Sequence, residues 1–508
     1  MEIINIILIF SLIITLTLSY LSLLKKRTAM EIVNDMGIGY NLANSFDNYV
    51  LYNMEIKINN IEDQLTLYGN PILTKKMIKN IKHKGFKTIR FPVTWMYFMY
   101  DNGTINTDWM SRVKEVVNWI INNKMYCILN VHGDAHDSNW LIKYYPKPHD
   151  KYINLWSQIA EEFKDYNDYL IFESMDKGYF YNGTYDYDTL LSLTQIFVDT
   201  IRNSERYNKE RLLLISGMNS LIDYTCNRYY KIPFDPNNKI AISLHYFEPT
   251  AFTTFSNINK WGLSQDYSDI IKNFENLKYY FIDKGIPVIL TEIEVSTNSE
   301  KEPISVREYL YLVFSLSDEQ KGIMPCFWDT SNSSFPNVEE YSLFFFNYFN
   351  RETNKWYDKK IENIFDQIIY KKYFKPSNFY IITNTMNIYN ENKNVALTAN
   401  IGEFKILKII LNAYIRGKLE NYNYFNLLCN HMDTPWRYAM NFSINKIRKQ
   451  YDGTYYFFLD VNDDECYSQI IVYQLYNCNL NNLTIEFNNT FRYFDFKAYK
   501  SVIISHIN

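Results

Sequence analysis

The 508-residue sequence lacks several patterns that mark common classes of protein. Its net charge is −4 and no basic stripe is present, which argues against a nucleic-acid-binding surface. The seven histidines and six cysteines are scattered without the spacing of a zinc site, so the sequence predicts no metal and no organic cofactor. No glycine-rich phosphate loop follows the first predicted strand, which disfavours a dinucleotide-binding open sheet.

Cysteine is also too unevenly placed to define a disulfide framework. Three cysteines fall in the first part of the chain and three in the last, so full pairing within either part is impossible. The sequence therefore makes no prediction about disulfide pairing. The length of the chain and its 47% hydrophobic content are sufficient for two domains with buried cores.

The first 27 residues form a segment of their own. Residues 4–24 are almost entirely apolar and are followed by the basic sequence KKR, so the segment is long enough to span a bilayer or to act as a signal peptide. The trailing basic residues oppose export. Six N-x-S/T sequons favour it: Asn102, Asn182, Asn332, Asn441, Asn482 and Asn488. We expect entry into the secretory route, with residues 1–27 either cleaved or kept as a single membrane anchor.

Between residues 28 and 365, eight apolar runs alternate with longer helix-like segments such as 109–123, 152–166, 190–203 and 306–316. β-rich runs separated by helices predict a parallel sheet, and eight such units predict a (β/α)8 barrel, with a doubly wound sheet as the alternative. The runs are MGIGYNL (36–42), KTIRFPV (87–93), MYCILNV (125–131), YLIFESM (169–175), LLLISG (212–217), IAISLHY (240–246), PVILTE (287–292) and IMPCFW (323–328).

The sequence pattern changes after about residue 372. Short β-like runs divided by Asn, Asp and Gly replace the helical periodicity, which predicts a smaller all-β, sandwich-like domain over residues 372–508. Carbohydrate binding is one hypothesis for this domain, but packing is the favoured explanation for any single Trp or Tyr in it. Its role stays open.

Polar and aromatic residues follow the predicted strands of the barrel within two positions. A single such residue is explained by capping or by a core hydrogen bond, but residues from seven strands at one rim indicate a site, because barrel function lies at the carboxyl ends of the strands. These residues are Asn41, Arg90, His132, Asp176, Lys177, His245, Glu292 and Trp328.

Six segments of the predicted barrel carry a more specific signal. They read GYNLANSFD (39–47), GFKTIRFPVTW (85–95), ILNVHGD (128–134), SLHYFEPTAFT (243–253), GIPVILTEIE (285–294) and CFWDTSNS (326–333). In this order they resemble the strand motifs of glycoside hydrolase family 5, especially its cellulase-like endo-β-1,4-glucanases. The resemblance implies a barrel that acts on or binds β-glucan. It also implies a nucleophile at Glu292 and substrate-binding residues at Asn41, Arg90, His132, His245 and Trp328.

The fourth-strand segment departs from the family pattern. The family reads F-E-x-M-N-E-P, whereas this chain reads FESMDKG, so Asp176 stands for asparagine and Lys177 for the acid/base glutamate. Retaining hydrolysis needs a second carboxyl group, first to protonate the leaving oxygen and then to activate water. Gly133 and Phe247 also replace a histidine and a tyrosine of the family. Lost or much reduced hydrolysis is therefore expected.

Two alternatives stay open. A relocated acid/base, Asp176 or Glu294, would give an active retaining glycosidase with Glu292 as nucleophile. A cell-surface adhesion or scaffold protein could instead use an inactive barrel as its support. A closed ion pair between Lys177 and Glu292 would favour this scaffold hypothesis.

The predicted partner is a β-glucan polysaccharide. Trp328 would form a stacking floor for the sugar chain, and Trp95 and Trp140 would extend it, although core packing is the competing explanation for each tryptophan. The sequence makes no prediction of the oligomeric state.

Overall fold

The computed structural model describes residues 26–370 with gaps and, beyond residue 370, the backbone of the strands only. The gaps are residues 51–56, 136–140, 142–148, 178–185, 255–257, 260, 262–263, 298–300, 302 and 334–345. Residues 1–25, which carry most of the predicted signal or anchor segment, lie outside the described residues. Among the described helices, none has the length and apolar character needed to cross a bilayer.

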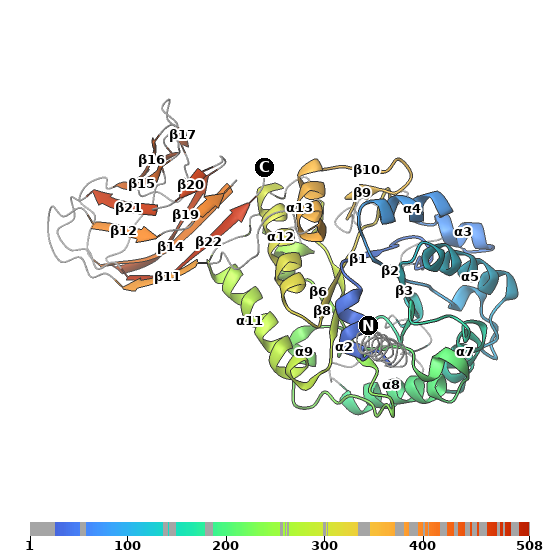
Figure 1. Cartoon of the computed structure of the whole chain (residues 1–508). Helices are drawn as coiled ribbons and strands as arrows, with labels where there is room; N and C mark the ends of the chain where they lie inside the picture. The colour runs from blue at the N-terminus through green and yellow to red at the C-terminus, as the bar shows by residue number, and fades with distance from the viewer. Residues whose placement is uncertain are drawn as a thin grey trace, which may run out of the picture.

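Eight parallel strands close into a barrel in the order of the sequence (Figure 1). Each of the eight predicted apolar runs contains one strand, and β1 pairs with both β2 and β8, which excludes the open sheet. The predicted (β/α)8 fold is thus confirmed. The strands are β1 Gly39–Asn41, β2 Thr88–Phe91, β3 Tyr126–Asn130, β4 Leu170–Glu173, β5 Leu213–Ser216, β6 Ile240–Tyr246, β7 Val288–Ile293 and β8 Ile323–Phe327.

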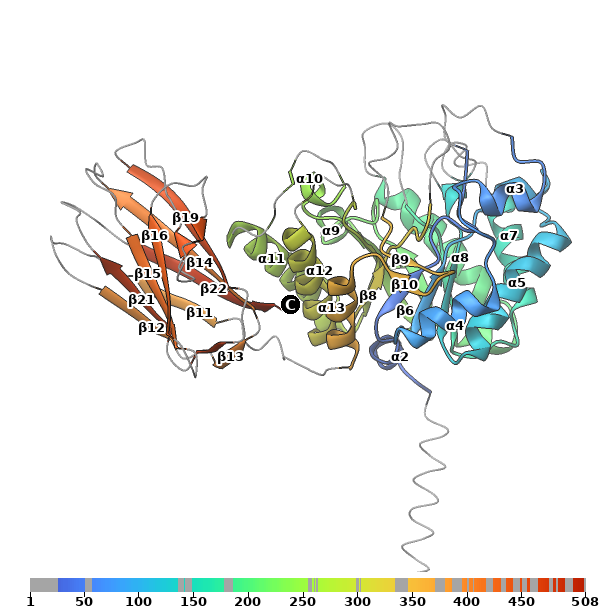
Figure 2. The same cartoon turned by 90° about the horizontal axis from the view of Figure 1, so that it is seen from above.

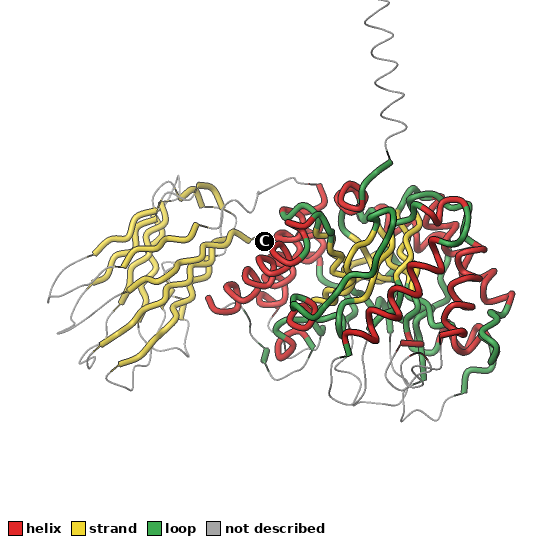
Figure 3. Tube along the Cα trace, turned by 90° about the horizontal axis from the view of Figure 1, so that it is seen from below, coloured by secondary structure: helices red, strands yellow, loops and turns green. Residues whose placement is uncertain are grey.

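Helices surround the strands, as the red tubes around the yellow barrel show in Figure 3 and the view from above in Figure 2. The four helix-like segments quoted from the sequence correspond to α5, α7, α8 and α12. The described helices of this region are α2 Ala29–Asp35, α3 Ile61–Thr66, α4 Lys75–His83, α5 Thr107–Asn122, α7 His149–Glu162, α8 Tyr187–Arg202, α9 Ile222–Thr225, α10 Thr250–Thr253, α11 Ser264–Tyr280, α12 Pro303–Glu319 and α13 Lys359–Tyr370. A small hairpin and four 3-10 turns complete this region. The hairpin consists of β9 Phe349–Asn350 and β10 Lys355–Trp356, and the turns are η1 Met96–Phe98, η2 Gly133–Ala135, η3 Arg206–Lys209 and η4 Ile282–Lys284.

The interior of the barrel is apolar at its amino-terminal end. Side chains alternate along each strand, so one set packs against the helices and the other fills the interior. Helix α2 lies over this end and begins with a capping box between Thr28 and Glu31. Its apolar face joins the interior side chains in one buried cluster that includes Ile32, Val33, Met36, Ile128, Ile171, Leu214, Ala241, Ile289 and Met324. This end is therefore closed by hydrophobic packing.

The next interior-facing positions toward the carboxyl ends of the strands are polar. They form the layer that follows the apolar interior side chains along the strands, and all are fully buried: Arg90, Asn130, Glu173, Ser216 and Ser243. Charged groups at this depth require internal partners. The change from an apolar to a polar layer marks the end of the barrel at which a site is expected.

The strands beyond residue 370 confirm the second, all-β part of the fold. They form two four-stranded antiparallel sheets, in the orders β11-β22-β14-β19 and β12-β21-β15-β16, and two two-stranded antiparallel sheets, β13-β20 and β17-β18. The domain boundaries at 28–365 and 372–508 stay predictions. The strands are β11 Tyr380–Thr385, β12 Val395–Ala399, β13 Gly402–Phe404, β14 Ile406–Arg416, β15 Tyr424–Asn430, β16 Pro435–Asn441, β17 Arg448–Lys449, β18 Tyr455–Tyr456, β19 Glu465–Gln474, β20 Cys478–Leu480, β21 Leu483–Asn488 and β22 Lys497–His506.

Candidate active site

A bulge in β7 sets the direction of Glu292. Leu244 on β6 pairs with Leu290, but the next residue, His245, pairs with Glu292, so β7 carries one extra residue at Thr291. The Thr291 hydroxyl donates to the Leu244 carbonyl oxygen at 3.0 Å. Bulges of this kind re-aim the following side chain. The Glu292 carboxyl group thereby enters the buried polar layer, where it is 4% exposed.

Arg90 on β2 connects three carboxyl groups of this layer. Its Nη1 lies 2.7 Å from Glu292 Oε1, its Nε 2.7 Å from Glu173 Oε2, and its Nη2 2.9 Å from Asp176 Oδ1. Arg90 Nη1 also donates to Asn41 Oδ1 at 3.2 Å, and the Asn41 amide donates to the backbone of β7 and β8. Asn41 and Arg90 are fully buried, so in this structure both hold the carboxyl groups in place.

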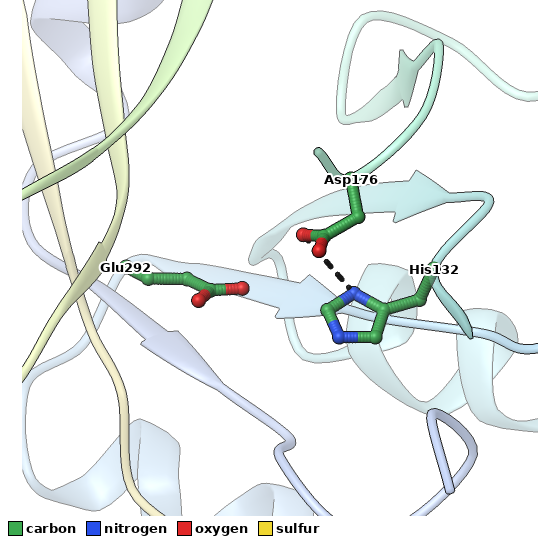
Figure 4. Close-up of side chains that lie close together, drawn as sticks. All are labelled: His132, Asp176 and Glu292. Carbon is green, nitrogen blue, oxygen red and sulfur yellow. Dashed lines mark ion pairs between the residues drawn. The ribbon is translucent and has the colours of Figure 1, made fainter. Parts of the chain in front are cut away.

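Asp176, just beyond β4, lies at the centre of the polar layer. Its Oδ1 is 3.3 Å from His132 Nδ1 and 3.3 Å from His245 Nε2, and Figure 4 shows the contact with His132. The hydroxyl groups of Ser216 and Ser220 donate to its backbone oxygen at 2.7 and 3.0 Å. These two serines were missed from the sequence. Ser216 ends the fifth apolar run and could have been found by the rule that located the other strand-end residues.

The electrostatics of Asp176 and Glu292 differ in direction. Burial opposes ionisation of Asp176, but His132, His245 and Arg90 outweigh it and hold its pKa well below the ordinary value. Burial and then the negative charge of Asp176 raise the pKa of Glu292, against the effect of Arg90. The aspartate that stands for the family's neutral asparagine therefore disfavours the ionised form of Glu292.

Lys177, at the family's acid/base position, takes no direct part in this network. It is half-buried, and its ammonium group lies 5.6 Å from the centre of the Phe247 ring in a cation–π contact. Among the described residues, the ion pairs of Glu292 go to Arg90 and His245, with 3.1 Å between His245 Nδ1 and Glu292 Oε2. The closed Lys177–Glu292 ion pair that would favour a scaffold is not formed.

The predicted aromatic floor is only partly supported. Trp328, directly after β8, stacks on the His132 ring with 5.9 Å between ring centroids and 16° between planes, and it is 8% exposed. The prediction that Trp95 extends the floor is wrong. Its indole is fully buried and donates to the Asn130 carbonyl oxygen at 3.0 Å, because the chain turns into the core after β2. Trp140 lies outside the described residues.

The structure thus brings together most of the strand-end residues predicted from the sequence. Asn41, Arg90, Asp176, His245 and Glu292 form one connected network, with His132 and Trp328 stacked beside it and Lys177 set apart. Glu294, which the sequence offered as a relocated acid, is 6% exposed, and burial followed by the charge of Glu292 raises its pKa well above the ordinary value.

The site matches a known family along most of the barrel. The family model for cellulase (glycosyl hydrolase family 5) matches residues 49–334. "Endoglucanase A" of Ruminococcus albus is 32% identical over 379 residues, which cover 69% of this chain and 96% of that protein. "Endoglucanase A" of Clostridium longisporum is 32% identical over 352 residues, and this chain spans 65% of its length.

Solved structures agree with the sequence comparisons. A "GH5-4 broad specificity endoglucanase" from an uncultured bovine rumen ciliate shares 45% identity at a TM-score of 0.64, covering 68% of this chain and 99% of that one. A family 5 xyloglucanase from Paenibacillus pabuli, solved with a ligand, shares 30% identity at a TM-score of 0.59, covering 66% and 99%. The resemblance predicted from the strand motifs is therefore confirmed. The chain belongs to glycosyl hydrolase family 5 and is endoglucanase-like.

Proposed function

We propose that the barrel binds a β-1,4-linked glucan across the carboxyl ends of its strands and that its hydrolysis of ordinary β-glucans is lost or much reduced. The observation that carries this proposal is Lys177, which offers an ammonium group where the family's proton donor stands. Lys177 has no carboxyl group, so it cannot take the two successive roles of the family's glutamate, which protonates the leaving oxygen and then activates water as a carboxylate.

The retained side of the cleft supports carbohydrate binding. Glu292 is held by Arg90 and His245, and Trp328, which is 8% exposed, stacks on His132 beside them. The relatives named endoglucanases cover nearly the whole barrel. A β-glucan is therefore the polysaccharide to test first.

A second candidate function is retaining hydrolysis with a relocated acid/base. Asp176 is a poor candidate because its carboxyl group is bound by Arg90 and lies against two histidines. Glu294 is the better one, since it stands two residues after Glu292, just beyond the end of β7, where the family motif has glycine. Among the described residues, no ion pair engages its carboxyl group, and the charges that act on it are those of Glu292 and Lys177.

The decisive measurement is the hydrolysis of an aryl β-cellobioside and of a soluble β-glucan by the purified protein. Glu292→Gln, Lys177→Glu and Glu294→Gln are measured in parallel. We expect no turnover of the β-glucan by the unmodified protein and partial rescue by Lys177→Glu. Weak turnover of the aryl glycoside is compatible with the proposal, because an activated leaving group needs no acid.

Turnover of the soluble β-glucan by the unmodified protein, abolished by Glu292→Gln, would contradict the proposal. Loss of that turnover in Glu294→Gln would then identify the relocated acid. Binding is measured separately, by calorimetric titration of cello-oligosaccharides into the Glu292→Gln variant, so that affinity and catalysis are not confused.

For localisation we propose entry into the secretory route through residues 1–27. The apolar segment 4–24 and the sequons support this proposal. Amino-terminal sequencing of the mature protein and a shift in mobility after removal of N-glycans test it. An intact amino terminus on a protein confined to the cytoplasm would overturn it.

A further inference from the structure

The buried layer around Arg90 carries more negative than positive charge. One guanidinium group faces the carboxyl groups of Glu173, Asp176 and Glu292, and all four side chains are at most 6% exposed. When the three carboxyl groups are ionised and the rings of His132 and His245 are neutral, two negative charges are left uncompensated in this layer. Buried charge is costly unless it is neutralised, either by protons or by a bound cation. One divalent cation would neutralise this excess.

Three side chains at this layer form a set of metal ligands. His132, Asp176 and Glu292 each offer one ligand atom, and these atoms lie within 4.8 Å of one another (Figure 4). His132 Nδ1 is 3.3 Å from Asp176 Oδ1, which is about the spacing of two ligands on a tetrahedral ion with bonds of roughly 2.0–2.1 Å. We propose that His132, Asp176 and Glu292 bind a divalent transition-metal ion of the Zn²⁺ type.

The chemistry of this donor set selects the class of ion. One imidazole and two carboxyl groups suit Zn²⁺ and its neighbours among the first-row metals, and a catalytic-type zinc site uses three protein ligands and leaves a fourth position open. Asp176 is the residue that completes the set, because the family's asparagine would supply no charge. The side chains of all three are at most 7% exposed, which keeps their geometry fixed by packing.

His245 is a second, independent observation that points to a ligand here. Its side chain is fully buried, and neither ring nitrogen makes a hydrogen bond of acceptable geometry. Both nitrogens nevertheless lie close to the proposed ligands, Nδ1 3.1 Å from Glu292 Oε2 and Nε2 3.3 Å from Asp176 Oδ1. Buried polar atoms are almost always satisfied, and a histidine that orients ligating carboxylates is a common partner of a metal site.

Arg90 shares the carboxyl groups with the proposed cation. It contacts Asp176 through Oδ1, the oxygen that faces His132, and Glu292 through Oε1, whereas Glu292 Oε2 lies 3.1 Å from His245 Nδ1. Arg90 is fully buried, whereas His132 and Glu292 are 6% and 4% exposed, so the cation would bind on the side of the carboxyl groups that His132 faces. The proposed metal site does not depend on β-glucan binding.

The test is a titration of the full-length protein with Co²⁺ after treatment with a chelator and its removal. The visible absorption of protein-bound Co²⁺ reports its coordination, and Zn²⁺ is added afterwards as a competitor. We expect one Co²⁺ per chain, displaced by Zn²⁺. Asp176→Asn and His132→Ala should each weaken binding at least about tenfold. His83→Ala, which removes an exposed histidine, should leave it unchanged.

Asp176→Asn is the sharpest variant because it preserves shape and restores the family's residue. Its fold is checked by circular dichroism, and Glu292→Gln serves as a second isosteric variant. The proposal is overturned if the unmodified protein gives no Co²⁺ absorption, or if Asp176→Asn binds Co²⁺ as tightly as the unmodified protein. Either result would mean that protons alone compensate the buried charge. Neither result bears on β-glucan binding, which calorimetry measures without metal.

Discussion

The two sides of the cleft differ in how deeply their residues are buried. On the nucleophile side, Arg90 and His245 are at most 1% exposed and match the family motifs. On the acid/base side, Lys177 is half-buried, contacts the ring of Phe247, and both residues depart from the family motifs. The buried side neutralises charge inside the barrel, so its loss would destabilise the fold whatever the protein does. Lys177 neutralises no charge inside the barrel, so the chemistry alone would keep the family's glutamate at its position. Asp176 is the exception, because it departs from the family although it is buried and ion-paired with Arg90.

The largest effect is expected from removing the buried guanidinium group of Arg90. Arg90→Met leaves the carboxyl groups of Glu173, Asp176 and Glu292 without their guanidinium partner. We expect a loss of about 3–5 kcal/mol in the free energy of unfolding, the effect of breaking a buried ion pair from one side. Urea unfolding followed by tryptophan fluorescence measures it. Lys177→Met is the matched control and should stay within about 0.5 kcal/mol of the unmodified protein. Similar losses in both would break the comparison.

The second prediction restores the altered side. Lys177→Glu supplies a carboxyl group and Phe247→Tyr supplies the missing hydroxyl, so the double variant should hydrolyse soluble β-glucan at least about a hundredfold faster than the unmodified protein. Release of reducing ends measures the rate. Lys177→Gln with Phe247→Tyr is the control, because it removes the cation without adding a proton donor. A rate for the control equal to that of the restored variant would show that the proton donor is not what is missing.

A smaller effect is expected from the aromatic floor. Trp328→Ala should weaken the binding of cello-oligosaccharides about fivefold, since a single stacking contact contributes on the order of 1 kcal/mol. Calorimetric titration measures the affinity. Tyr207→Ala removes a half-exposed ring on η3, before β5 and thus at the opposite end of the barrel, and should change nothing. Equal effects of the two variants would place the sugar elsewhere.

The ion pair between Arg202 and Asp235, at the opposite end of the barrel, predicts how the stability of the fold depends on pH. Burial opposes ionisation of Asp235, but two hydrogen bonds from Arg202, at 2.7 and 2.9 Å, outweigh it and lower its pKa. A carboxyl group with a lowered pKa in the folded state stabilises the fold above its unfolded pKa of about 3.9 and loses this contribution as the pH falls below it. Asp235→Asn should remove on the order of 1 kcal/mol at pH 7 and less at pH 3. Unfolding curves of both proteins at pH 7 and pH 3 measure this loss of stability. An equal loss at the two pH values would contradict the prediction.

Much of the fold could be predicted because its signals are local. Each apolar run contains one barrel strand, and the polar residues that follow those runs lie at one end of the barrel. Asp176 and Lys177 follow the same strand, yet the sequence could not show that the first enters the polar layer and the second turns to Phe247. Trp95 was misplaced for the same reason, because four residues beyond a strand the chain direction depends on packing and no longer on the period of the strand.

The sequence by itself determined the barrel, the all-β part that follows it, the family and the lysine at the family's acid/base position, because strand periodicity and motif residues belong to short segments of the chain. Only the tertiary structure decided that Arg90 bridges Glu173, Asp176 and Glu292, and that His132 faces Asp176. The partners in these four contacts are separated by 44 to 202 positions in the chain. They meet because barrel closure and the bulge at Thr291 bring the ends of separate strands to one buried layer, where charge must find a partner.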